Sequence, residues 1–185
     1  MKTEYNNLED IIKLDTSKLI LLSGTGGVGK STVGLNIINS IVSQNLQCVI
    51  FNLETSKETI LQKVNNSEYI SIYDTPNITV DYIEEKCKKI KHTKNIKLVL
   101  IDYLQLINYE NNIEKVSKKL KVLSQELNLT ILVLSQLSTN LENKKPTIED
   151  LTESRSVANV SDVVVFLYKE NDKTNIIISK NELEM

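Results

Sequence analysis

The amino-acid sequence predicts an α/β protein with a mainly parallel central sheet, flanked by helices and closed by a C-terminal antiparallel hairpin. Short apolar runs alternate with segments of helical spacing, which is typical of parallel α/β proteins. Most of the runs are nearly continuous rather than alternating, as in strands that are covered on both faces. The third observation is a glycine-rich loop between the first run and the first helical segment.

Six apolar runs have the length of strands. They cover residues 19–22, 48–53, 98–101, 130–134, 163–168 and 175–179. The last two are separated only by residues 169–174, which is too short for a crossover helix. These two runs are therefore expected to form the antiparallel hairpin at the end of the sheet.

The segments between these runs have helical patterns. Apolar residues at spacings of three and four form one stripe in residues 33–42 and another in residues 113–127. Residues 81–94 begin with acidic and end with basic side chains, an order that suits the helix dipole. A shorter helix is expected at residues 56–64.

Length and composition are typical of a soluble single-domain protein. The 185 residues suffice for one domain, which we assign to residues 19–185 after an N-terminal extension of residues 1–18. The net charge of −2 creates no global field toward nucleic acid or anionic membranes. No apolar run approaches the roughly 20 residues that span a bilayer, so we expect no membrane partner. Cys48 and Cys87 lack metal-ligand spacing, and as reduced structural thiols they favour a cytoplasmic location.

The strongest functional signal is the concentration of all five glycines between Gly24 and Gly34. Residues 24–31 read Gly-Thr-Gly-Gly-Val-Gly-Lys-Ser and fit the phosphate-binding pattern G-x-x-x-x-G-K-[ST]. A glycine-rich turn can match by chance, but the strand before this loop and the helix after it supply the context that the pattern needs. Main-chain N–H groups then point at the phosphates, Lys30 reaches the β/γ oxygens and Ser31 ligates Mg²⁺. The residues expected to bind the nucleotide are Gly26, Gly27, Val28, Gly29, Lys30, Ser31 and Thr32.

Three polar residues at the ends of apolar strands are candidates for the same site. Asp102 stands where a Walker B carboxylate holds Mg²⁺ or its water shell, although an aspartate here can also cap the next element. Glu54 can orient and deprotonate an attacking water, or it can cap the following helix. Gln136 is either a sensor of the γ-phosphate or an ordinary loop glutamine. Because strand C-termini converge on one crevice in such sheets, these residues are expected near the phosphate loop.

Further motifs occur in order along the rest of the chain. They are Phe-Asn-Leu-Glu-Thr-Ser at 51–56, Ile-Asp-Tyr-Leu-Gln-Leu-Ile at 101–107, Leu-Val-Leu-Ser-Gln-Leu-Ser at 132–138, Pro-Thr-Ile-Glu-Asp-Leu-Thr-Glu-Ser at 146–154, Ser-Asp-Val-Val-Val-Phe-Leu-Tyr at 161–168 and Ile-Ile-Ile-Ser-Lys-Asn at 176–181. Together with the loop they resemble the C-terminal ATPase domain of DnaB-type replicative helicases, in a shortened and partly degenerate form. The resemblance implies a RecA-like P-loop ATPase domain over residues 19–185.

The resemblance implies a role for each candidate residue. The family's catalytic carboxylate, phosphate lysine and γ-phosphate sensor match Glu54, Lys30 and Gln136. The Mg²⁺ ligands match Ser31 and Asp102, and the cofactors that the resemblance implies are ATP and Mg²⁺.

Several positions depart from the family pattern. In the family, the last strand has a lysine and, two residues on, an arginine, and both reach the neighbouring subunit's ATP site. Lys180 matches the lysine, but Glu182 stands at the arginine position. Arg155 is the only arginine of the chain and lies in another segment. Lys63 stands where the family has an arginine, and the stretch 64–69 is shorter than in the family.

The segment that the family uses to contact DNA is also altered. Residues 136–157 have slightly more acidic than basic side chains and no aromatic residue. Single-strand binding proteins use a positive groove, aromatic side chains or both. Arg155 is therefore either a phosphate contact or a solvated surface charge.

Two functions follow from these features. The first is an ATPase of the DnaB-like RecA class that slowly hydrolyses ATP to ADP and phosphate at a subunit interface, in DNA replication or recombination. The alternative is an ATP-binding switch or adaptor without helicase activity that binds a replication protein. The partners implied are ATP and, as candidates, single-stranded DNA, a homo-oligomer or a replication protein. The loop also resembles that of ParA and MinD partition ATPases, but Thr25 stands where those proteins have a lysine.

Overall fold

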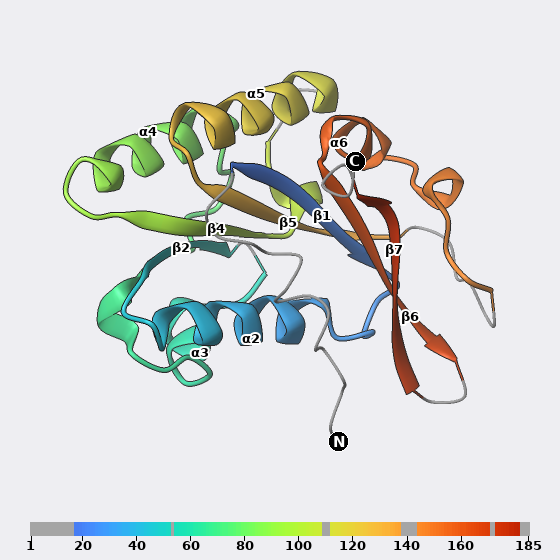
Figure 1. Ribbon diagram of the computed structural model, residues 1–185, viewed down its shortest axis with the longest axis horizontal. Helices are drawn as coiled ribbons and strands as arrows, with labels where there is room; N and C mark the ends of the chain where they lie inside the picture. Colours follow the sequence, from blue (N-terminus) through green and yellow to red (C-terminus); the bar gives the residue numbers. More distant parts are fainter. Residues whose placement is uncertain (1–16, 53, 109–111, 138–143, 171–172, 182–185) are drawn as a thin grey trace.

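The computed structural model describes residues 17–52, 54–108, 112–137, 144–170 and 173–181. Within these residues one seven-stranded sheet lies between two layers of helices (Figure 1). Its strands are β1 (Lys18–Gly24), β2 (Gln47–Asn52), β3 (Ile70–Tyr73), β4 (Ile96–Asp102), β5 (Thr130–Gln136), β6 (Val163–Glu170) and β7 (Lys173–Asn181).

Helices cover both faces of the sheet (Figure 1). The layer on one face consists of α2 (Lys30–Val42) and α3 (Lys57–Leu61). The layer on the other face consists of α4 (Val80–Lys91), α5 (Ile113–Glu126) and α6 (Arg155–Val160). The described parts of the connections contain the short 3₁₀ turns η1 (Ser67–Tyr69), η2 (Leu104–Leu106) and η3 (Ile148–Asp150).

Alternate residues of the central strands enter two separate cores. In β1, Leu19 and Leu21 belong to the core under α4 and α5, whereas Ile20 and Leu22 belong to the core under α2. All seven residues of β1 are buried. Because both faces of the strand are covered, its central positions all favour apolar side chains, which explains the continuous run in the sequence.

The strand order is β3-β2-β4-β5-β1-β6-β7, and every neighbouring pair is parallel except β6 and β7. The predicted parallel sheet with a C-terminal antiparallel hairpin is therefore confirmed. Strands β4, β5 and β1 are neighbours at the centre, so the loops that follow them lie at one edge of the sheet. Ligand sites of such sheets form at this edge.

Four details differ from the expectation. The sequence does not predict β3, which has four residues and lies partly exposed at the sheet's edge. It does not predict α6, whose six residues are too few to show a stripe. Helix α3 has five residues and is shorter than the helix expected at residues 56–64. Strand β2 ends at Asn52, so Glu54 lies in the connection behind the strand rather than at its end.

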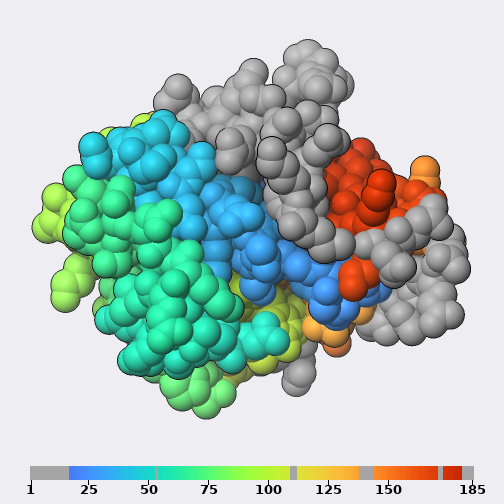
Figure 2. All heavy atoms as spheres, turned by 90° about the horizontal axis from the view of Figure 1, so that it is seen from below, coloured from blue at the N-terminus to red at the C-terminus, as the bar shows by residue number. Residues whose placement is uncertain are grey.

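The face that α2 and α3 form is shown in Figure 2, where segments from the first half of the chain make up much of the surface. Helix α2 turns Ile37, Ile38 and Ile41 toward the sheet and leaves Asn36 exposed. No helix in the described part of the chain is long and apolar enough to cross a bilayer.

Candidate functional site

A loop of residues 24–29 joins β1 to α2 at the carboxyl edge of the sheet. Gly27 and Gly29 have φ angles of 69° and 103°, in the left-handed region that favours glycine. Helix α2 then starts with no side-chain cap, whereas α4 and α5 start with caps from Thr79 and Asn112. An uncapped helix start beside a glycine loop presents main-chain N–H groups to an anion.

The start of the loop is packed tightly against the neighbouring strand. A Cβ at Gly24 would lie 2.6 Å from the carbonyl oxygen of Leu167 on β6 and 2.9 Å from the side chain of Val28. Since no side chain fits here, glycine allows β1 to run directly into the loop.

Beside this loop lies a pocket of about 340 Å³. Its walls come from the loop and the first turn of α2, from the ends of β4 and β5, and from the connection after β2. The lining residues are Gly26, Gly27, Gly29, Lys30, Ser31, Thr32, Glu54, Asp102, Tyr103 and Gln136. All of them except Tyr103 are predicted site residues, so the fold brings together groups that are far apart in the sequence.

Lys30 lies along the loop. Its Nζ donates hydrogen bonds to the carbonyl oxygens of Gly24, at 3.0 Å, and Thr25, at 2.9 Å. Burial lowers the pKa of Lys30, against the opposing influence of the Asp102 and Glu54 carboxylates. The partners of the ammonium among the described residues are these two neutral oxygens, and a phosphate would bind it more strongly because an anion is a stronger acceptor.

Asp102 ends β4 at the pocket, with only 6% of its surface exposed. Burial raises the pKa of its carboxyl group, a hydrogen bond with the Ser31 side chain opposes this rise, and the charges of Glu54 and Lys30 respectively raise and lower the pKa. A partly desolvated carboxylate beside a hydroxyl supplies the oxygen ligands that a hard cation prefers.

The carboxylate of Asp102 and the hydroxyl of Ser31 fit a Mg²⁺ ion that is bound together with a triphosphate. Among the residues that the structure describes, no group of three or more His, Cys, Asp or Glu side chains could hold a metal ion. Ser31 and Asp102 would supply two oxygen ligands to Mg²⁺, and phosphate oxygens would supply others. Mg²⁺ is usually held in this way, by one or two protein ligands and by substrate phosphates.

Glu54 is carried by a turn that Asn52 fixes. The Oδ1 of Asn52 accepts hydrogen bonds from the main-chain N–H groups of Glu54, at 3.0 Å, and Thr55, at 3.1 Å. Its Nδ2 donates to Oγ1 of Thr55 at 3.0 Å. Asn52 is 4% exposed, so the turn is anchored in the sheet. The only sequence signal for this role is an asparagine two positions before the acid, which suits an Asx turn.

Gln136 is exposed at the end of β5 and faces the loop, because its Nε2 lies 3.4 Å from the place of a Cβ on Gly26. Gln105, from η2, holds the same strand end. Its Nε2 donates to Oγ of Ser135 at 3.1 Å and to the carbonyl oxygen of Gln136 at 3.0 Å. Nothing in the sequence pattern singles out Gln105 except its place shortly after Asp102.

Two predicted or discussed residues have side chains that lie elsewhere, and a third is not described. The side chain of Val28 is 3% exposed and packs in the core under α2, so only its main chain belongs to the loop. Arg155 is exposed at the start of α6, where its charge acts on Glu149. Glu182 lies outside the described residues.

Lys180 does not line the pocket of its own chain. It pairs with Val164 near the amino end of β6, whereas the phosphate loop starts opposite Leu167. Its Nζ donates hydrogen bonds to the carbonyl oxygens of Asn159, at 3.2 Å, and Ser161, at 2.6 Å. The lysine thus contacts the end of α6.

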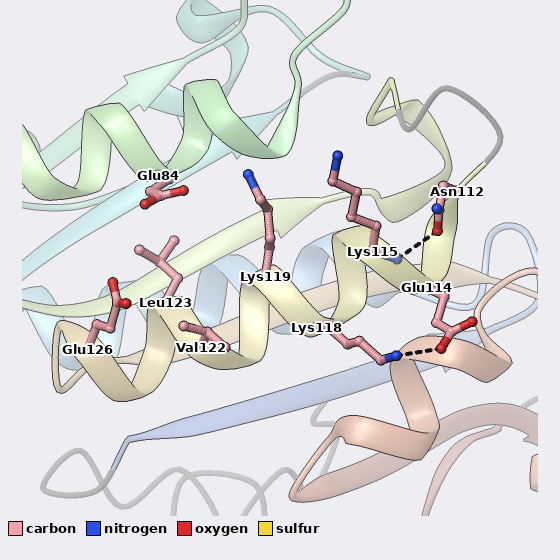
Figure 3. Close-up of a pocket in the computed structure, with 9 residues that line it drawn as sticks. All are labelled: Glu84, Asn112, Glu114, Lys115, Lys118, Lys119, Val122, Leu123 and Glu126. Carbon is pink, nitrogen blue, oxygen red and sulfur yellow. Dashed lines mark hydrogen bonds and ion pairs between the residues drawn. The ribbon is translucent and has the colours of Figure 1, made fainter.

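A larger hollow of about 650 Å³ lies along α5, on the side of α4 (Figure 3). Its charged side chains are mostly engaged in ion pairs. Lys118 pairs with Glu114 at 2.6 Å, and Lys88 pairs with Glu84 at 2.5 Å and with Glu126 at 3.5 Å. Its lining contains no glycine, and the start of α5 beside it is capped. The chemistry of the smaller pocket therefore identifies the candidate site better than size does.

The chain is similar to a known protein family, to curated relatives and to solved structures. The model of the family described as DnaB-like helicase C terminal domain matches the chain in two pieces, residues 1–69 and 62–183. The pieces meet in the stretch where the sequence is expected to be shorter than the family.

Two curated relatives are replicative helicases. The replicative DNA helicase DnaB of Geobacillus stearothermophilus is 29% identical over 212 residues, covering 91% of this chain and 47% of the relative. The probable replicative DNA helicase of Trieres chinensis is 30% identical over 220 residues, covering 89% of this chain and 48% of the relative. The chain therefore spans about half the length of the curated relatives it matches. Both alignments are longer than the 185-residue chain, so they include positions at which it has no residue.

Two solved structures share the fold. One, described as an ATPase domain, has a TM-score of 0.80 at 22% identity and covers 91% of this chain and 78% of that chain. A DnaB-like replicative helicase, described with its interactions with primase, has a TM-score of 0.80 at 23% identity and covers 92% and 54%. These neighbours confirm the predicted RecA-like fold class.

Proposed function

The chain belongs to the DnaB-like helicase C-terminal domain family, and on this premise we propose that it is an Mg²⁺-dependent P-loop ATPase acting in DNA replication or recombination. The proposal is supported by one pocket beside the glycine loop, in which an ammonium, a hydroxyl, two carboxylates and an amide lie together. These groups belong to Lys30, Ser31, Asp102, Glu54 and Gln136. They match the parts that phosphoryl transfer to water requires.

Binding of ATP begins at the loop. Main-chain N–H groups of the loop and of the first turn of α2 contact the phosphates. The ammonium of Lys30 exchanges its hydrogen bonds with Gly24 and Thr25 for the β/γ oxygens. Ser31 and Asp102 would hold Mg²⁺, which would supply positive charge against the phosphate oxygens.

Hydrolysis depends on the opposite wall of the pocket. Glu54, on the turn that Asn52 fixes, orients the attacking water and accepts its proton. Gln136 contacts the γ-phosphate from the end of β5. Lys30 stabilises the charge that develops on the transferred phosphoryl group. The products are ADP and phosphate.

In the proposed motor, the ATP site lies at an interface between copies of the chain, and the motor moves along single-stranded DNA. Lys180 is then the residue that reaches a neighbouring site, in place of an arginine finger. A lysine lacks the planar fork of a guanidinium, so we expect slow turnover.

A second function is favoured by the contacts of Lys180. Its ammonium is engaged by two carbonyl oxygens of its own chain, and Arg155 is the only arginine in the sequence. An arginine finger can contribute about 10³–10⁵-fold to turnover in related NTPases. A chain that lacks one suits an ATP-binding switch or adaptor, which binds a replication protein without unwinding DNA.

Phosphate release from purified protein with ATP and Mg²⁺ tests the first function. We expect slow turnover that Lys30→Ala abolishes, with weak or absent stimulation by a single-stranded oligonucleotide. Lys94→Ala is the matched control, because Lys94 is exposed and does not line the pocket. Turnover that survives Lys30→Ala would show that this pocket is not its source.

Mass measured by light scattering separates the two functions. The measurement compares the protein alone with the protein plus a non-hydrolysable ATP analogue and an oligonucleotide. A ring supports the motor, and a persistent monomer supports the switch or adaptor.

A further inference from the structure

Strands β4 and β5 separate before they reach the pocket. Their ladder ends at the pair of Ile101 and Val133, yet β4 continues to Asp102 and β5 continues to Gln136. On its other side, β5 remains paired with β1 as far as Gly24 and Gln136. The end of β5 is thus aligned with the phosphate loop by the sheet, but the ladder does not tie it to β4.

The side chain of Gln105 spans this gap. Its Nε2 donates to Oγ of Ser135 at 3.1 Å and to the carbonyl oxygen of Gln136 at 3.0 Å. Its Oε1 accepts a hydrogen bond from the main-chain N–H of Gln136 at 3.4 Å. One amide therefore contacts both main-chain polar groups of Gln136 and replaces the ladder that β4 and β5 lack here.

Gln105 itself is held in place by its turn. Its neighbour Leu104 is fully buried, and Ile107 is 2% exposed. The N–H groups of Leu106 and Ile107 donate to the carbonyl oxygens of Tyr103, at 3.1 Å, and Leu104, at 3.0 Å. The amide is thus presented from a fixed element, which a positioning group requires.

We propose that Gln105 is a positioning residue that holds Gln136 against the site of the γ-phosphate and couples it to the strand of Asp102. This inference rests on the proposed function, since it requires a triphosphate in the pocket. Gln105 does not line the pocket and acts through the main chain of Gln136, whose side chain faces Gly26. Displacement of such a group by about 1 Å can cost about 100-fold in rate.

Gln105→Met tests the role, because methionine keeps the length of the side chain and removes all three hydrogen bonds. We expect kcat to fall by about 10- to 100-fold. The KM for ATP should change by less than about twofold, because the loop and Lys30 are untouched. Gln105→Ala is a second variant in case methionine packs badly. The matched control is Gln125→Met, since Gln125 is exposed on α5, away from the pocket.

A double-mutant cycle with Gln136→Met tests whether Gln105 acts through Gln136. If it does, Gln105→Met adds little to the loss that Gln136→Met causes alone. A purely structural role would lower stability in both backgrounds and would give losses that multiply. An unchanged kcat in Gln105→Met, or multiplied losses in the double variant, would overturn the proposal.

The wild-type protein and Lys30→Ala are measured first, so failure of the proposed function is seen separately. If the wild type does not hydrolyse ATP, equilibrium binding of a non-hydrolysable ATP analogue and of ADP replaces kcat. The role of Gln105 is supported if the wild type binds the analogue more tightly than ADP and Gln105→Met lowers this preference by about tenfold. A preference that is absent in the wild type, or unchanged in the variant, contradicts it.

Discussion

The side-chain oxygen of Asn52 lies 3.0 Å from the main-chain nitrogen of Glu54, and this contact turns the chain behind β2. Asn52 is nearly buried, whereas Glu54 is exposed at the rim of the pocket. The carboxylate therefore extends into solvent from a turn that is fixed in the sheet.

Asn52→Ala should slow hydrolysis without preventing nucleotide binding. The variant loses the hydrogen bonds that order residues 54 and 55, so the carboxylate samples other positions, and we expect kcat to fall by about 10- to 100-fold. Asn36→Ala, on the exposed side of α2, is the matched control. Steady-state phosphate release gives kcat for both variants. An Asn52→Ala enzyme with wild-type kcat would disprove the role of the turn.

Asp102→Asn should stabilise the nucleotide-free protein while it removes Mg²⁺-dependent turnover. Burial raises the pKa of Asp102, so the charged form costs folding free energy at neutral pH. Relief of such a functional-site cost typically adds about 0.5–2 kcal/mol to the free energy of unfolding. Urea unfolding at pH 7 without nucleotide measures the difference, and a less stable Asp102→Asn would contradict the expectation.

The same comparison has a defined pH dependence. Above the folded-state pKa of Asp102 the cost is present in full. As the pH falls through that pKa, the native carboxylate takes up a proton before the unfolded one does, and the wild type gains stability. Below the ordinary value of 3.8 both states are protonated and the cost is gone. The advantage of Asp102→Asn should therefore shrink on acidification, and an advantage that grows toward low pH would refute this account.

Two glycines of the loop should respond differently to alanine. A Cβ at Gly24 meets the carbonyl oxygen of Leu167 at 2.6 Å, whereas at Gly26 the nearest atom is Nε2 of Gln136 at 3.4 Å. Gly24→Ala should therefore lower the free energy of unfolding by about 1–3 kcal/mol. Gly26→Ala should change it by less than about 0.5 kcal/mol and should weaken ATP binding through Gln136. Equal unfolding midpoints for the two variants would exclude this steric distinction.

The two cysteines should be inert in the folded protein. Burial raises the pKa of both Cys48 and Cys87 to about 12. At pH 8 only about one thiol in 10⁴ is then a thiolate, the reactive form. We expect a chromogenic disulfide reagent to label neither residue until denaturant unfolds the chain, with free cysteine as the control. Rapid labelling of the native protein would contradict the burial of these thiols.

Much of the fold could be predicted because its signals are local in the sequence. Burial of both faces makes β1 continuously apolar, and the short link between β6 and β7 allows only a hairpin. Strand β3 could not be predicted from the sequence because it lies at the sheet's edge, where Ser71 and Tyr73 are only partly buried. Helix α6 could not be predicted either, because six residues are too few to show a helical period.

The site residues likewise divide into those that the sequence predicts and those that it does not. The loop can be found by its motif, and Asp102 by its place at the end of an apolar strand. Gln105 cannot be found so, because its partners lie 30 and 31 residues away in the chain. The contacts of Lys180 likewise span 21 and 19 residues. Such roles depend on which loops meet at one edge of the sheet, and the topology decides this.

The ammonium of Lys180 connects β7 to the last turn of α6 through the carbonyl oxygens of Asn159 and Ser161. A neighbour that recruits this charge must first release it from the oxygens of Asn159 and Ser161, which then need water or another donor. In the proposed oligomer, docking of a neighbour at β7 and fraying of this six-residue helix would be linked equilibria. If Lys180 serves a neighbouring ATP site as proposed, the cost of releasing these two contacts would reduce the free energy of that association.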